Sequence, residues 1–151
     1  MIEKRPGIVR EFLADDLDEA WALDQSCFEP GIAYSRAEIR SFVRRPGAVA
    51  LAAERGGRLE GFAIAERRGA RGHVITTDVA ETARRRGVGR RLFAELFARL
   101  ESAGAGEIRL EVDVRNAGAI RFYEGLGFDR TRILHGYYAK GLDAFEMIRK
   151  G

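Results

Sequence analysis

The sequence predicts a single α/β domain in which strands and helices follow the order βααβββαβαββ. Two observations carry this prediction. Apolar residues recur with the period of a strand in some segments and of a helix in others, and glycine or proline separates these segments. In addition, 151 residues with 46% hydrophobic side chains can bury a core without a disulfide or a structural metal. We therefore expect residues 1–151 to form one domain.

The first three predicted elements are a strand and two helices. Residues 7–13 alternate in short apolar steps that are typical of a strand. A helix follows, with Asp15 or Asp16 as its N-cap, and it ends at the next proline and glycine. The second helix should begin at Ser35, because Ser35 and Glu38 have the spacing of a capping box, in which each side chain satisfies the other's backbone N–H.

Three strands are predicted next. Two apolar runs, residues 48–54 and 59–66, are joined by a loop that contains Gly56 and Gly57, which is typical of a hairpin. Residues 73–79 are rich in β-branched side chains and predict the third strand of this group.

The remaining elements alternate between helix and strand. Residues 87–100 place apolar side chains on one stripe with charges opposite, which predicts a helix. Residues 107–114 alternate as a strand does, and residues 117–126 return to a helical pattern until a glycine stops it. Residues 129–134 and 144–149 predict two closing strands. No repeat or long linker divides the chain.

The residue content excludes several classes of protein. Cys27 has no partner for an internal disulfide, and with only His73 and His135 it cannot complete a Cys/His zinc site, so we expect no metal. No eighteen apolar residues follow one another, and no apolar run follows Lys4 and Arg5 near the start. We therefore expect a protein of the reducing cytoplasm that has no membrane partner.

Charge is unevenly distributed, although the net charge is only +3. Acidic residues gather between residues 11 and 29, and five arginines gather between residues 84 and 91. Nucleic-acid binding usually requires a broad basic face, whereas this basic cluster is local and the other end is acidic. We therefore do not expect nucleic acid as a partner.

Residues 79–92 run from a predicted strand through a glycine turn into the most regular helix. Gly87 and Gly89 carry no side chains, so backbone N–H groups at the helix start can approach a phosphate, while the helix dipole and the arginines add positive potential. The stretch is neither a Walker A loop nor a three-glycine dinucleotide fingerprint. It predicts a pyrophosphate site; the alternative is that the glycines tighten a turn and the arginines are solvated or contact nucleic acid.

Two motifs in this order resemble those of the GNAT superfamily of acetyl-CoA-dependent N-acetyltransferases. Motif A of that family, [QR]-x-x-G-x-[GA], is matched at Arg84, Gly87 and Gly89. Motif B, N-x-x-A-x-x-[FL]-Y-x-x-x-G-F, is matched at Asn116, Ala119, Phe122, Tyr123, Gly127 and Phe128. Within the superfamily, residues 109–116, the pair Tyr137-Tyr138 and residues 143–147 are similar to RimI-type protein N-terminal acetyltransferases.

The resemblance implies a fold and a co-substrate. The fold would be a mixed, mostly antiparallel sheet of about seven strands flanked by about four helices, with acetyl-CoA in a splay between the fourth and fifth strands. The residues implied to contact acetyl-CoA are Val79, Arg84, Arg85, Arg86, Gly87, Val88, Gly89, Arg90, Asn116 and Tyr123. The backbone of Val79 should pair with the pantetheine amides, and the Asn116 side chain should meet the pantetheine arm as well as cap its helix.

The resemblance also implies two catalytic residues. Glu111 would draw the proton from the acceptor amine through water, and the Tyr123 phenol would serve the departing thiolate. Asp113 lies on the same strand face and is the rival base. An α-amine has a pKa of about 7.7 to 8.0 against about 10.4 for a lysine side chain, so an N-terminal acceptor demands less of its base. Without the resemblance, Glu111 would be a surface carboxylate and Tyr123 a core tyrosine.

Aromatic residues are candidates for the acceptor site, because they suit the backbone and first side chain of a peptide. We nominate Phe28, Tyr34 and Tyr138 beside Glu111, although each could serve packing alone. Two positions, Leu142 and Ala139, depart from the family pattern near the acceptor end. Cys27 is expected to be a buried apolar thiol and not a nucleophile.

The sequence thus predicts an acyltransferase that moves acetyl from acetyl-CoA directly to a primary amine, namely a protein or peptide N-terminal α-amine. The alternatives are a small cationic amine such as a polyamine or antibiotic, a protein lysine, or a non-catalytic acyl-CoA-binding module. We expect a monomer or homodimer.

Overall fold

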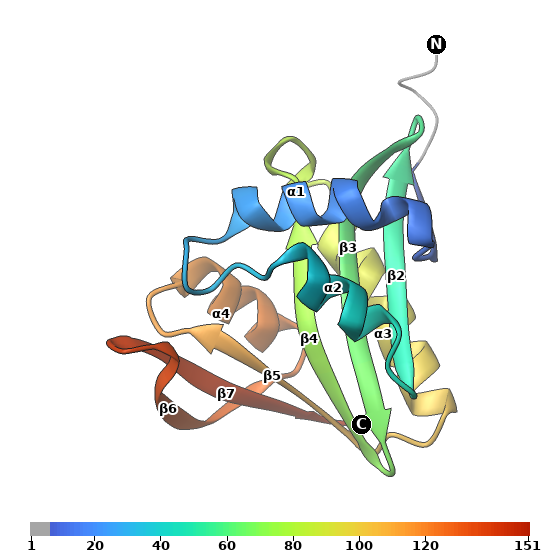
Figure 1. Ribbon diagram of the computed structural model, residues 1–151. Helices are drawn as coiled ribbons and strands as arrows, with labels where there is room; N and C mark the ends of the chain where they lie inside the picture. The colour runs from blue at the N-terminus through green and yellow to red at the C-terminus, as the bar shows by residue number, and fades with distance from the viewer. Residues whose placement is uncertain (1–6) are drawn as a thin grey trace.

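The computed structural model describes residues 7–151 and arranges them around one seven-stranded sheet (Figure 1). Residues 1–6, which include Lys4 and Arg5, lie outside this range. The strands are β1 (Ile8–Glu11), β2 (Ala48–Arg55), β3 (Arg58–Arg68), β4 (Arg71–Val79), β5 (Glu107–Asp113), β6 (Asp129–Ala139) and β7 (Leu142–Lys150). The helices are α1 (Leu17–Cys27), α2 (Arg36–Val43), α3 (Val88–Ser102) and α4 (Ala117–Gly125), with 3-10 turns at Ala14–Asp16 and Glu81–Ala83. The predicted order of elements is confirmed.

The sheet order is β1-β2-β3-β4-β5-β7-β6, and every neighbouring pair is antiparallel except β4 with β5. This parallel pair is registered over only three positions, from Arg71 opposite Glu107 to His73 opposite Arg109. Beyond them the two strands diverge, as Figure 1 shows. The mixed sheet and the splay between the fourth and fifth strands are therefore confirmed.

Helices cover both faces of the sheet. α3 and α4 pack on one face, where Leu92, Phe93 and Leu96 are fully buried against strand residues. α1 and α2 cover the other face, where Ile39 packs with Phe62 (Figure 1). Because neighbouring strand residues point to opposite faces, β2 and β3 contribute to both clusters.

Local sequence signals correctly predict where most helices and strands begin and end. The capping box of α2 is present: Glu38 N donates to Ser35 Oγ at 3.1 Å, and Ser35 N donates to Glu38 Oε1 at 2.9 Å. Gly56 and Gly57 both have positive φ, as the predicted hairpin requires. Asp16 is the N-cap residue of α1, as predicted, but its carboxylate accepts from Leu13 N and makes no capping hydrogen bond to α1.

The closing hairpin is longer than predicted. β6 continues to Ala139 and β7 begins at Leu142, so only two residues form the turn, and Gly141 has a φ of 80°. An irregularity between Leu134 and Ala139 interrupts the register, and Gly136 within it has positive φ. Because this glycine interrupts the alternating pattern in the sequence, the predicted strand ended too early, whereas β6 continues past it.

Candidate active site

The site lies where β4 and β5 separate, with the start of α3 on one side and the outer strands β5 to β7 on the other (Figure 1). A parallel pair that stops pairing leaves backbone groups of both strands without a ladder partner. Such an opening can receive an extended, amide-containing ligand as a partial strand.

The two glycines at the start of α3 are favoured for different structural reasons. Gly87 is the N-cap with a φ of 80°, and its position has open space around it, so a backbone requirement favours glycine there. Gly89 lies where an added Cβ would come 3.1 Å from Cζ of Phe122, so a packing requirement favours glycine there. Motif A and motif B therefore touch each other at this point.

The first amides of α3 have the arrangement that an anion site requires. Arg91 N donates to Gly87 O at 3.0 Å, and the N–H groups of Val88, Gly89 and Arg90 precede this bond. Gly87 supplies no side-chain acceptor for them. The Val88 side chain is buried in the core, so its amide is the part that a ligand can reach. N–H groups at a helix start bind phosphate well.

The arginines around this turn do not all serve the same purpose. Arg86 and Arg91 lie near the buried carboxylate of Glu60, at 3.4 and 4.0 Å, and their charge is partly offset. In the part of the chain that the structure describes, Arg85 and Arg90 are exposed and take part in no ion pair. These two are the arginines that remain available to an anion.

Arg84 lies at the inner end of the turn. Its Nε donates to Val79 O at 3.2 Å, and its Nη2 contacts Cys27 Sγ at 3.7 Å. The Cys27 thiol also donates to Val79 O at 3.7 Å. Burial raises the pKa of this thiol, which keeps it protonated and fits the prediction of a passive cysteine. The carbonyl of Val79 is thus in use within the protein, and its pairing with pantetheine stays a prediction.

Glu111 is not a surface carboxylate. Its side chain is only 8% exposed, and Oε1 lies 2.7 Å from Nε2 of His73. The Tyr137 hydroxyl donates to the same oxygen at 3.2 Å. Arg109 Nε lies 3.5 Å from the other oxygen. Three groups therefore hold this carboxylate in one orientation on the inner side of β5.

The rival base Asp113 is engaged elsewhere. Arg115 holds its carboxylate at 2.6 Å, and this contact lowers the pKa of Asp113. Arg115 also binds Glu29 at 2.5 Å. A carboxylate that is tied to an arginine is a weaker base, so the geometry favours Glu111 over Asp113.

Tyr123 belongs to an aromatic cluster on the same side of the sheet as α3. Its ring centroid lies 5.7 Å from those of Phe93 and Phe122 and 6.1 Å from that of Phe128. Within residues 7–151 its hydroxyl makes no hydrogen bond, so its donor is available. Burial, with a smaller contribution from Asp78, raises the pKa of Tyr123 to about 12, so the phenol stays protonated at neutral pH.

Asn116 caps α4, since its Oδ1 accepts from Ala119 N at 3.1 Å. The helix-capping part of its prediction is confirmed. Its contact with the pantetheine arm stays a prediction.

Two of the three predicted acceptor residues come together around Glu111. Burial, and then the charges of Asp24 and Glu111, raise the pKa of Tyr34 to about 12. Burial and the neighbouring Tyr137 and Tyr34 raise the pKa of Tyr138 as well. Phe28 stands apart: its N–H closes α1 on the carbonyl of Asp24, and its ring belongs to neither buried cluster.

Sequence reasoning missed two residues of the site, His73 and Tyr137. Both bind Glu111, from β4 and β6. From the sequence alone, His73 is considered only as a metal ligand, because its contact with Glu111 depends on the parallel register of β4 with β5. Of the pair Tyr137-Tyr138, the residue whose hydroxyl reaches Glu111 is Tyr137.

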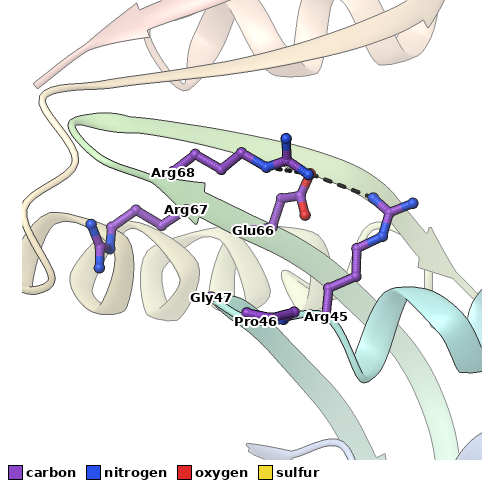
Figure 2. Close-up of a pocket in the computed structure, with 6 residues that line it drawn as sticks. All are labelled: Arg45, Pro46, Gly47, Glu66, Arg67 and Arg68. Carbon is purple, nitrogen blue, oxygen red and sulfur yellow. Dashed lines mark hydrogen bonds and ion pairs between the residues drawn. The ribbon is translucent and has the colours of Figure 1, made fainter.

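The structure contains a cavity of about 590 Å³ at the opposite end of the sheet. Figure 2 shows its lining residues, Arg45, Pro46, Gly47, Glu66, Arg67 and Arg68. Glu66 is buried and lies 3.5 Å from Arg45 and 3.9 Å from Arg68. Its one carboxylate, Glu66, is engaged by these two arginines, and Glu66 is paired with His73 across β3 and β4.

Among residues 7–151, no three His, Cys, Asp or Glu side chains gather as a metal site would require. None of the helices in that range combines the length and the apolar character needed to cross a bilayer.

Comparisons with known proteins agree on one family. Residues 13–128 match the model of the family described as "Acetyltransferase (GNAT) family". An N-alpha-acetyltransferase of Saccharolobus solfataricus is 42% identical over 80 residues, which are 52% of this chain and 48% of that protein. An uncharacterized N-acetyltransferase of Methanocaldococcus jannaschii is 31% identical over 144 residues, 95% of this chain and 91% of the other.

Among solved structures, the ribosomal-protein-S18-alanine N-acetyltransferase from Escherichia coli superimposes with a TM-score of 0.86 at 26% identity, covering 96% of this chain and 94% of that one. The chain spans about half the length of the first curated relatives that it matches.

Proposed function

The chain belongs to the acetyltransferase (GNAT) family, and we propose that it transfers the acetyl group of acetyl-CoA directly to the N-terminal α-amine of a protein or peptide. The observation that carries the proposal is the splay between β4 and β5, which has an anion site at the start of α3 and an oriented carboxylate, Glu111, on the opposite strand.

The residues around the splay suit acetyl-CoA. The amides of Val88, Gly89 and Arg90 would bind the pyrophosphate, with Arg85 and Arg90 adding charge from the surface. The diverging edges of β4 and β5 would receive the pantetheine arm as a partial strand, with Val79 and Asn116 at its sides. Acetyl-CoA supplies an activated thioester, and the protein has to hold it beside the amine.

Acetyl transfer needs a neutral amine, a held carbonyl and a leaving group that can accept a proton. The amine nitrogen attacks the thioester carbonyl, a C–N bond forms, and the C–S bond breaks. Glu111 receives the amine proton through water, while His73 and Tyr137 keep the carboxylate oriented. Tyr123 is protonated before the transfer, gives its proton to the departing sulfur and regains a proton from solvent.

An α-amine fits the acceptor side better than a polyamine does. A polyamine would need free carboxylates, but Glu29 and Asp113 are both paired with Arg115, which offsets one of their two charges. Tyr34 and Tyr138 offer aromatic faces suited to a peptide backbone. The names of two similar proteins, an N-alpha-acetyltransferase and an S18-alanine N-acetyltransferase, refer to acetylation of N-termini or alanine and support this choice. A cytoplasmic setting and a monomeric or homodimeric state are part of the proposal.

The test is acetyl-CoA-dependent thiol release with three sets of acceptors. The first set holds peptides with free N-termini and an internal lysine, the second holds the same peptides with blocked N-termini, and the third holds spermidine and related amines. We expect release with the first set alone. Release with the second would assign the lysine side chain, and release with the third alone would assign a small amine. No release with any set, while acetyl-CoA still binds, would contradict an enzymatic role.

A further inference from the structure

Two buried carboxyl groups meet beneath the acceptor side, and the mechanism above uses neither. Asp24 on α1 is 0% exposed, and Asp78 near the end of β4 is 1% exposed. Asp24 acts on Asp78 through a side-chain hydrogen bond and through its charge, and both raise the pKa of Asp78. A carboxylate accepts hydrogen bonds and cannot donate one, so this contact requires a proton between the two groups.

The remaining bonds show where that proton lies. Asp24 Oδ2 accepts from Tyr34 N at 2.7 Å, and Asp78 Oδ1 accepts from Thr76 Oγ1 at 2.7 Å. The other two oxygens, Asp24 Oδ1 and Asp78 Oδ2, are buried and have no donor among residues 7–151. Each carboxyl thus has one oxygen satisfied by a neighbour and one left for its partner.

The surroundings hold no charge that could replace the proton. Neither carboxyl forms an ion pair with a basic side chain of the described range. The titratable groups that face the pair are neutral: the Cys27 thiol from α1, the Tyr34 phenol from the following loop and the Tyr123 phenol from α4. Arg84 bonds to Val79 O and Cys27 Sγ and forms no ion pair with either carboxyl. Burial, together with the adjacent Asp24, raises the pKa of Asp78 well above its usual value.

The pair joins two parts of the acceptor side. Asp24 is bonded through Tyr34 N to the loop between α1 and α2, which carries the predicted acceptor residues Phe28 and Tyr34. Asp78 is followed by Val79, whose carbonyl accepts from the Cys27 thiol at the end of α1. The shared proton therefore fastens the end of α1 and its loop to the end of β4, at the mouth of the splay. Gln25 Nε2 donates to Tyr34 O at 2.7 Å and gives the loop a second attachment.

We propose that Asp24 and Asp78, sharing one proton, are positioning residues that hold the loop between α1 and α2 against β4 and so set the affinity for the acceptor amine. This inference rests on the proposed function, because it assigns the loop to the acceptor. Loss of the proton places two buried negative charges side by side, and their repulsion releases α1 and the loop. The amides at the start of α3, which would bind the pyrophosphate, make no contact with the pair.

The effect has a defined direction with pH. The folded chain keeps a proton that the unfolded chain releases above a pH of about 3.9, so unfolding becomes more favourable as pH rises through the range between the unfolded and folded pKa values of Asp78. The acceptor KM of the wild type rises with pH once the proton is lost, with a limit of about tenfold per pH unit.

Asp78→Asn is the decisive variant, because its amide reproduces the protonated acid. The amide oxygen can accept from Thr76, and the amide nitrogen can donate to Asp24 Oδ1 at any pH. Asp78→Ala removes the link and leaves Asp24 as a buried charge. Glu66→Gln is the control for loss of a buried acid, since Glu66 is also buried in the sheet but is registered with His73, five residues along β4 from Asp78.

Two measurements use these variants from about pH 6 to about pH 9. The first is the melting temperature, where we expect the advantage of Asp78→Asn over wild type to grow as pH rises. The second is the acceptor KM, expressed as wild type over Asp78→Asn at each pH, so that titration of the acceptor amine cancels. We expect this ratio to rise, with the KM for acetyl-CoA unchanged, and Asp78→Ala to have a raised acceptor KM at every pH. Glu66→Gln should leave the acceptor KM unaffected.

A third measurement does not depend on activity. Cys27 is the only cysteine of the chain, so its alkylation rate reports release of the end of α1 from β4. We expect faster alkylation in Asp78→Ala than in Asp78→Asn. If the chain acetylates no amine, the proposed function fails, while melting and alkylation still report on the pair.

Three results would overturn the inference. A melting difference that does not vary with pH would exclude the shared proton. A changing melting difference with a constant KM ratio would show that the pair serves folding only. Equal alkylation of Asp78→Ala and Asp78→Asn would exclude release of the loop.

Discussion

The two sides of the splay are built by different means. On the α3 side, a ligand would meet backbone N–H groups that follow one another in the sequence, and Gly87 and Gly89 provide the access. On the β5 side, it would meet side chains from three separate strands, with His73, Glu111 and Tyr137 joined by hydrogen bonds. The first side depends on backbone conformation, whereas the second depends on the tertiary fold.

This difference predicts that substitutions on the two sides will affect different properties of the protein. Removing a single functional group on the β5 side should impair turnover and leave acetyl-CoA binding intact. Strain at the α3 side should affect stability and acetyl-CoA binding together. The predictions below test this division, beginning with the largest effect.

Glu111→Gln should have the largest effect. The amide keeps the size of the side chain and can still accept from His73 and Tyr137, but it cannot accept a proton, so kcat/KM for the acceptor peptide should fall by about 10²–10⁴-fold, the usual range for a general base. Steady-state thiol release measures the loss, and calorimetry should give an unchanged Kd for acetyl-CoA. Asp113→Asn is the control and should retain nearly full activity, because Arg115 already engages that carboxylate. If the two variants exchanged these results, Asp113 would be the base.

Tyr123→Phe should lower kcat by about 10²-fold, the lower end of the range for a proton donor. The ring keeps its aromatic contacts, and the hydroxyl has no hydrogen bond among the described residues, so the melting temperature should not fall. Because the pKa of Tyr123 is about 12, its phenol remains protonated through the whole assay range. The variant should therefore lower the pH–rate profile uniformly, and a change in the shape of that profile would assign the alkaline limb to Tyr123.

The sequence predicted the α3 side almost completely because its signals are local. The glycine turn, the helix stripe and the asparagine cap all act within a few residues, and the family resemblance that they carried is confirmed by the match over residues 13–128. The sequence did not show which arginines of the cluster remain free to bind an anion. Arg86 and Arg91 are offset by Glu60, which lies in a separate strand.

The β5 side was predicted only in part. Glu111 was identified from the family pattern, but its partner His73 is 38 residues away and its partner Tyr137 is 26 residues away. Only the short parallel register of β4 with β5 brings His73 next to Glu111. The Asp24–Asp78 pair was missed for the same reason, since a carboxylate on a helix face and another in a strand give no sign that they share a proton.

His73→Ala should reduce kcat by about tenfold, equivalent to about 1.4 kcal/mol, because one of the hydrogen bonds that orient Glu111 is lost while those of Tyr137 and Arg109 remain. The KM for acetyl-CoA should stay the same. His73→Gln retains an N–H donor and should recover part of the rate. An equal loss in both variants would mean that ring packing, and not the hydrogen bond, is what His73 contributes.

The smallest effects are expected at the two glycines, where Gly87→Ala and Gly89→Ala should each lower the free energy of unfolding by about 1 kcal/mol, and each should weaken acetyl-CoA binding. The causes differ, so a second substitution separates them. Phe122→Leu shortens the side chain that an alanine at position 89 would meet at 3.1 Å, and it should relieve Gly89→Ala in a double-mutant cycle measured by urea unfolding. It should not relieve Gly87→Ala, whose cost is the positive φ of the backbone. Equal relief of both would mean that packing against α4, and not backbone conformation, limits the whole turn.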